Sequence, residues 1–110
     1  MRVAAVMSDL MLFSRIDAAA AAEGVSLVRV DAPAQLPDGL DLILVDWSAR
    51  SADWADALRA RAADARLIVF GRHTDLEAHA AARAAGLGPM WARSKLVSEL
   101  GELMVSNRTS

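Results

Sequence analysis

Short apolar runs recur along the chain, and each is bounded by polar residues or glycine. Residues 42–45 form the most apolar run, whereas residues 25–30 alternate between apolar and polar side chains. A continuous apolar run is typical of a strand buried on both faces of a parallel sheet, and alternation is typical of an edge or half-exposed strand. The pattern predicts a central strand at 42–45 and further strands at 3–6, 25–30, 67–70 and 89–92.

The first strand is followed by a helical pattern. Ser8 and Asp9 are residue types that cap the N-terminus of a helix, and Gly24 is well suited to the position after a helix ends. We expect a helix between them, running to about residue 23. Its predicted inward face consists of apolar residues at helical spacing: Leu10, Phe13, Ile16 and Ala20.

The other strands are also followed by helical patterns, except the second. Helices are predicted from residue 51 to about 64, from a Thr74-x-x-Glu77 capping box to Gly86, and after Ser94 as the cap. Residues 31–40 contain two prolines and a glycine. Because proline breaks helix interiors, we expect a loop or a single turn there in place of a second helix.

Strands and helices alternate strictly, which predicts a parallel sheet with helices on both faces. We therefore predict an α/β fold: a three-layer, doubly wound, flavodoxin-like sandwich of five parallel strands in the order 2-1-3-4-5, with a shortened or missing second helix. A length of 110 residues fits one domain. We assign residues 1–105 to that domain and 106–110 to a C-terminal tail.

Composition narrows the choice of function. The net charge of −2 argues against nucleic acid as a partner, because phosphate binding requires clustered Lys and Arg. The absence of cysteine excludes disulfides and thiolate chemistry and suits the cytoplasm. The apolar run after Met1 ends at Ser8, too early for a signal peptide or a membrane span, so we expect a cytoplasmic protein without membrane attachment.

In an open α/β sheet, the functional site lies beyond the carboxyl ends of the strands. Asp46 comes directly after the most apolar strand, so it must be solvated in a cleft or paired, most simply with Arg93. Asp9 follows the first strand, where an N-cap role alone would explain it. The other residues expected at this edge are Ser8, Ser48, Phe70 and Gly71.

From about Arg2 to Met104 the chain resembles the receiver domains of bacterial response regulators. The resemblance places Asp46 at the phosphoacceptor position and Ser8-Asp9 at the acidic pair that binds magnesium, with serine in place of the first acid. It implies that Ser48 could offer its backbone carbonyl to the metal. It also places Arg93 where the family has lysine, and Met90 where it often has an aromatic switch residue.

The departures from the receiver pattern concern the phosphorylation chemistry. Receivers need Ser or Thr at the end of the fourth strand, but Phe70 and Gly71 occupy both plausible registers. Arginine at position 93 keeps the positive charge with different reach and geometry. Asp9 and Asp46, with Ser48, would give Mg²⁺ a weak site at best. We therefore expect a pseudo-receiver, and the alternative is an active receiver phosphorylated on Asp46 in the presence of Mg²⁺.

A small-ligand binding module and an enzyme are two further classes of function for a domain of this kind. A small-ligand binding module requires an open pocket between Asp9, Asp46 and His73. An independent enzyme is not expected, because no histidine accompanies a serine in a nucleophile motif. The predicted partners are signalling proteins, or a second copy of this chain, that contact the last two helices and the fifth strand near Met90 and Trp91.

Overall fold

The computed structural model describes residues 1–62 and 64–106, and it contains the predicted five-stranded sheet. All strand pairs are parallel, and the strand order is β2-β1-β3-β4-β5, as predicted. The strands are β1 (Arg2–Val6), β2 (Ser26–Val30), β3 (Leu42–Asp46), β4 (Arg66–Gly71) and β5 (Trp91–Ala92).

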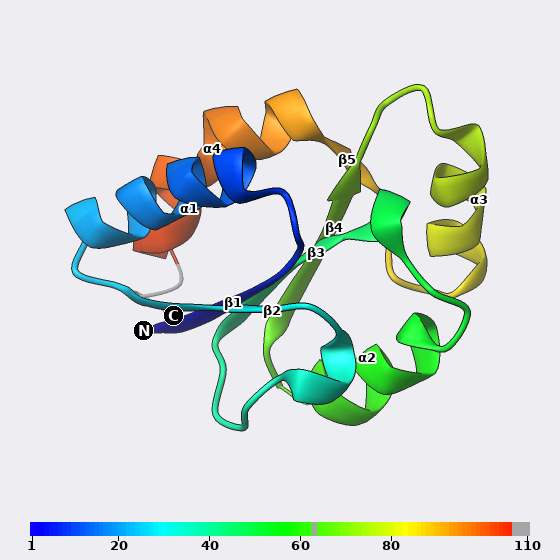
Figure 1. Cartoon of the computed structure of the whole chain (residues 1–110), viewed down its shortest axis with the longest axis horizontal. Helices are drawn as coiled ribbons and strands as arrows, with labels where there is room; N and C mark the ends of the chain where they lie inside the picture. Colours follow the sequence, from blue (N-terminus) through cyan, green and yellow to red (C-terminus); the bar gives the residue numbers. More distant parts are fainter. Residues whose placement is uncertain (63, 107–110) are drawn as a thin grey trace.

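Helices cover both faces of the sheet and complete the three-layer arrangement. Figure 1 shows α1 (Leu10–Ala22) and α4 (Arg93–Ser106) side by side on one face. The other face carries the 3₁₀ turn η1 (Pro33–Gln35), the 3₁₀ turn η2 (Trp47–Ala49), α2 (Trp54–Ala62) and α3 (Leu76–Ala84). The predicted fold class is therefore confirmed.

The sheet separates two hydrophobic cores. Val3 and Ala5 of β1 belong to the core under α1 and α4, whereas Ala4 and Val6 belong to the core under α2 and α3. Every residue of β3 is buried, which confirms its central position. Because β3 ends at Asp46, the most buried strand delivers a carboxylate to the carboxyl edge of the sheet.

The connection between β2 and β3 is a single turn, as the prolines predicted. Pro33 begins η1, and the Gln35 side chain accepts hydrogen bonds from the backbone N–H groups of Asp31 and Ala32 at 2.9 and 3.2 Å. Leu36 fills the core beneath this turn. Helix α2 packs against η1, and Arg61 donates a hydrogen bond to the carbonyl of Ala34 at 3.0 Å.

One residue predicted on the inward face of α1 and one predicted helix cap are wrong, whereas Ile16 and Ala20 are buried as predicted. Leu10 is 64% exposed, because the inward face of α1 is built from Leu12, Ile16 and Ala20. The N-cap of α3 is Asp75, one residue after the predicted Thr74, because its carboxylate accepts a hydrogen bond from the N–H of Ala78.

The chain between β5 and its end also differs from the prediction in detail. Helix α4 begins at Arg93, directly after β5, and needs no separate Ser94 cap. Ser106, assigned above to the tail, is the last residue of α4, and residues 107–110 lie outside the described residues. Within residues 1–62 and 64–106, no helix has the length and apolar character needed to cross a bilayer.

Candidate functional site

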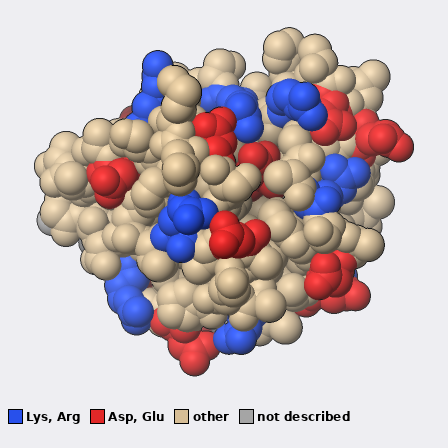
Figure 2. Space-filling view, viewed as in Figure 1, with Lys and Arg blue, Asp and Glu red and all other residues tan. Residues whose placement is uncertain are grey.

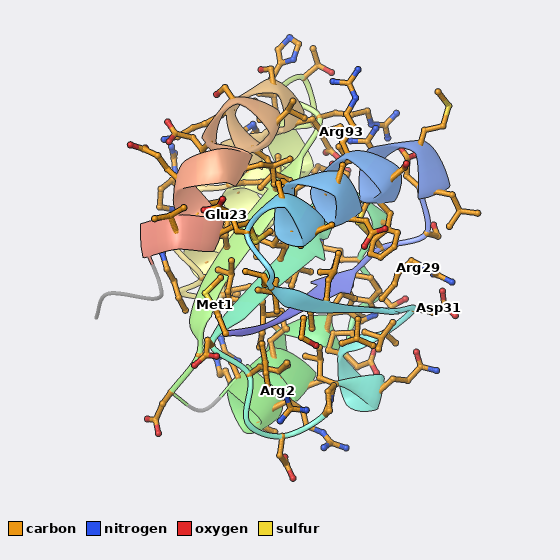
Figure 3. All side chains as sticks on the ribbon, turned by 90° about the vertical axis from the view of Figure 1, so that its left-hand side faces the viewer. Met1, Arg2, Glu23, Arg29, Asp31 and Arg93 are labelled. Atoms are coloured by element: carbon orange, nitrogen blue, oxygen red, sulfur yellow. The ribbon has the colours of Figure 1, made fainter. Side chains whose placement is uncertain are left out.

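The carboxyl edge of the sheet brings Asp9, Asp46 and Arg93 together from three separate parts of the chain. Asp9 follows β1, Asp46 ends β3, and Arg93 is the first residue of α4, directly after β5. Figure 3 shows Arg93 at the start of α4. Arg29 holds the neighbouring end of β1 in place, because its guanidinium donates to the Met7 carbonyl at 3.0 Å.

Arg93 lies between the two carboxylates. Its Nη1 is 3.2 Å from Oδ2 of Asp9, and its Nη2 is 3.3 Å from Oδ2 of Asp46. The predicted pairing of Asp46 with Arg93 is therefore present, and Asp9 shares the same cation. A single guanidinium supplies the positive charge at the place where both carboxylates converge.

Burial dominates the electrostatics of Asp46. Its side chain is only 6% exposed, compared with 39% for Arg93 and 34% for Asp9. This burial raises the pKa of Asp46 above its ordinary value, against the lowering effects of the Arg93 charge, the Arg93 hydrogen bond and the Ser48 backbone. Asp46 Oδ1 and Arg93 Nε are buried without a hydrogen-bond partner among the described residues. The pair is therefore incompletely satisfied.

Asp9 has a structural role as well as its contact with Arg93. Its Oδ1 accepts hydrogen bonds from the N–H groups of Met11 and Leu12, both at 3.1 Å, so it is the N-cap of α1 as predicted. Its other oxygen, Oδ2, faces Arg93. Both oxygens of Asp9 are engaged, while the adjacent Ser8 is exposed to solvent.

Ser48 connects the loop after β3 to the loop after β4. Its Oγ accepts a hydrogen bond from the N–H of Arg72 at 3.1 Å. The pKa of Asp75 is lowered, first by the hydrogen bond from the N–H of Ala78 and also by the hydroxyl of Ser48. Asp75 was not among the predicted site residues, although an aspartate directly before the first residue of a helix is a common N-cap.

Gly71 lies beneath this connection and leaves no room for a side chain. A Cβ at position 71 would overlap Ser48 Oγ and would lie 3.0 Å from the Sδ of Met90. Phe70, which pairs with Asp46 in the sheet register, is fully buried in the core under α1 and α4. Neither position offers a hydroxyl group to the site.

The residues expected at an interface differ in exposure. Met90 is 5% exposed and belongs to the core under α2 and α3, so its side chain is not available to a partner. Trp91 is partly exposed, and the Nζ of Lys95 lies 4.4 Å from the centre of its ring. His73 contributes its carbonyl oxygen to a contact with His79 Nε2 at 3.2 Å.

The donor atoms at this edge do not form a ready site for Mg²⁺. A hard divalent cation takes about six oxygen ligands, usually including carboxylates. Asp9 and Asp46 are both bound to Arg93, and Asp9 also caps α1. Within the described part of the chain, no three acidic or histidine side chains are grouped so that they could hold a metal ion.

The parallel sheet in the order 2-1-3-4-5, with helices on both faces, has a receiver-like α/β fold. Two solved structures share this fold. A response regulator from Thermotoga maritima matches with a TM-score of 0.69 and 15% sequence identity. The receiver domain of the Francisella response regulator 1452 matches with a TM-score of 0.67 and 16% sequence identity. Each match covers 99% of this chain and 98% of the other chain.

The similarity is one of fold. No protein-family model matches the chain, and no curated protein matches it at a significant level.

Proposed function

We propose that this chain is a pseudo-receiver, a receiver-like signalling module that acts through protein–protein contacts without a phosphorylation switch. The observation that carries the proposal is the position of Arg93 between Asp9 and Asp46, within 3.3 Å of both carboxylates. A tethered cation at this point competes with any metal ion for the same oxygens. Mg²⁺ must displace it before binding, so its affinity is weak.

Phosphoryl transfer to Asp46 would lack two groups that usually assist it, a bound divalent cation and a hydroxyl group at the end of β4. A carboxylate attacks phosphorus usefully when a divalent cation and oriented donors spread the charge of the transferring group. Arg93 competes for the place of the cation, and position 71 has no room for the hydroxyl that receivers use. These features favour the pseudo-receiver over the active phosphoacceptor, and they suit a module that is not an enzyme in its own right.

The proposed contact surface consists of the exposed sides of α3, β5 and α4. Trp91 is partly exposed there, Val105 is 42% exposed, and Leu76 at the start of α3 is 77% exposed. Apolar side chains on a polar surface suit a protein partner. We propose a signalling protein in the cytoplasm as that partner, and a second copy of the chain is the other candidate.

Figure 2 shows acidic and basic side chains interspersed over the face that it presents. This mixed distribution, together with the net charge of −2, suits a protein partner better than nucleic acid.

The decisive experiment is a titration with Mg²⁺ and beryllofluoride, a phosphoryl mimic, followed by NMR. We expect no saturable shift at Asp46 in the native chain. Arg93→Ala serves as the sensitised variant, because it frees both carboxylates and should gain shifts. Shifts in the native chain that disappear in Asp46→Asn would overturn the proposal and favour the active receiver.

A further inference from the structure

A hollow of about 460 Å³ lies on the sheet face that carries α2 and α3. Its walls are made largely of alanine: Ala52 and Ala55 on the side of α2, and Ala81 and Ala85 on the side of α3. The two helices lie on the right in Figure 1, with α2 below α3. Small side chains on both walls leave the space between these segments unfilled.

The hollow follows from the missing second helix. With only η1 between β2 and β3, α2 packs against η1, where Arg61 bonds to Ala34, and a gap opens on its other side toward α3. Arg59 of α2 reaches across to α3 and donates to the carbonyl of Ala85 at 2.7 Å. Helix α2 is therefore hydrogen-bonded to neighbouring segments on both of its sides.

The polar groups of the hollow are hydrogen-bond donors. Trp47 is 2% exposed and lines the hollow, and its Nε1 has no hydrogen-bond partner among the described residues. The Arg50 guanidinium lies 5.5 Å from the centre of the Trp47 ring and donates to the Trp47 carbonyl at 3.3 Å. Within the described chain Arg50 forms no salt bridge, although its charge contributes to lowering the pKa of Asp75. No acidic residue lines the hollow.

We propose that this hollow binds a small organic anion. The volume lies within the range of about 300–1,000 Å³ that is typical of small-molecule sites. The alanine methyl groups provide the apolar part of the walls, while Arg50 and the hydroxyl of Ser51 provide donors for a carboxylate or sulfonate. The site shares no residue with Asp9, Asp46 and Arg93 and does not depend on the proposed signalling role.

The probe for this site is anilinonaphthalene sulfonate, an aromatic anion, titrated into the native chain and followed by heteronuclear NMR. We expect saturable shifts at the amides of Ala55, Ala81 and Ala85, with a dissociation constant below about 1 mM. The indole Nε1–H signal of Trp47 should shift with the same saturation curve, because Trp47 lines the hollow.

Two variants test the chemistry of the site. Arg50→Gln should weaken binding about tenfold, because it removes a charge-assisted hydrogen bond. Ala81→Leu should abolish binding by filling the hollow, and Ala52→Leu, at an exposed position, repeats that test if the first variant unfolds. Arg83→Gln is the matched control, since Arg83 is an exposed arginine of α3 outside the hollow and its replacement should leave binding unchanged.

Several results would overturn the proposal. One is the absence of saturable shifts up to about 1 mM probe, which is also the result expected if the hollow accepts only a side chain from a protein partner. Others are shifts centred on Trp91 and α4, or equal affinity in the native chain and in Arg50→Gln.

Discussion

The hydroxyl oxygen of Ser48 occupies the space where a side chain at position 71 would begin. The Oγ of Ser48 accepts the N–H of Arg72, one residue beyond Gly71, and thereby holds the loop after β3 against the end of β4. Glycine at position 71 is required by this close approach. The same approach removes the hydroxyl that a receiver would use at the end of this strand.

Gly71→Ala should therefore lower the free energy of unfolding by about 1–3 kcal/mol, the usual cost of overpacking a filled site. In a Ser48→Ala background the same substitution should cost less, because the overlapping oxygen is gone and only Met90 must adjust. Denaturant unfolding of the four proteins in this double-mutant cycle measures the coupling. Additive effects would show that Ser48 is not the obstacle.

Removal of the Arg93 guanidinium should destabilise the chain by about 1–3 kcal/mol, because it leaves a buried carboxylate without its partner. Arg93→Lys should recover only part of this loss, since a point charge on a flexible stem does not bridge two carboxylates as a planar fork does. Thermal unfolding of both variants beside the native chain measures the difference.

Mg²⁺ should stabilise Arg93→Ala more than it stabilises the native chain. With the guanidinium gone, the carboxylates of Asp9 and Asp46 can share a divalent ion, and binding to the folded state raises the melting temperature. The native chain should show little change. An equal rise in both proteins would mean that Arg93 does not compete with the metal.

The fold could be predicted from the sequence because the apolar runs and their periodicity correspond to the strands and helices that are buried. The apolar run at 42–45 can be buried on both faces only in the centre of a sheet, and the prolines after β2 prevent a full helix. Element ends were harder to place, as at Asp75, because Thr74 and Asp75 are both good caps and the choice depends on how α3 packs on the sheet.

The residues at the carboxyl edge and the pairing of Asp46 with Arg93 were predictable from the sequence, but the additional contact of Arg93 with Asp9 was not. Sheet topology brings Asp9, Asp46 and Arg93 to one edge, and this follows from element order. The sharing of one guanidinium by both acids depends on side-chain conformations that no spacing encodes. The hollow beside Trp47 was not predicted, because it depends on how the segments that carry its lining residues pack together.

Asp46 makes the stability depend on pH in a specific direction. Burial raises its pKa in the folded state above the ordinary value of 3.8, so the folded state holds this proton more tightly than the unfolded state does. Its contribution to stability is therefore fully present below pH 3.8 and is lost as the pH rises through the folded pKa. Asn at position 46 does not titrate. The stability of Asp46→Asn, measured relative to that of the native chain, should therefore increase as the pH rises.

Unfolding of the native chain and of Asp46→Asn in denaturant over a series of pH values measures this difference. Subtraction of the two curves cancels the titration of the other acids. A variant that loses stability relative to the native chain as the pH rises would show that the Arg93 ion pair outweighs burial.

The contribution of Asp75 to stability should depend on pH in the opposite direction to that of Asp46. The hydrogen bond from the N–H of Ala78, assisted by the Ser48 hydroxyl, lowers its pKa in the folded state. Its stabilising contribution is therefore present above the unfolded pKa of 3.8 and is lost as the pH falls through the folded value. Asp75→Ala should destabilise the chain near neutral pH, and this difference should shrink in acid, as unfolding in denaturant at matched pH values can measure. Asp75→Asn should recover most of the loss, because asparagine also caps helices. If it does not, the charge of Asp75 contributes more than its position at the start of α3.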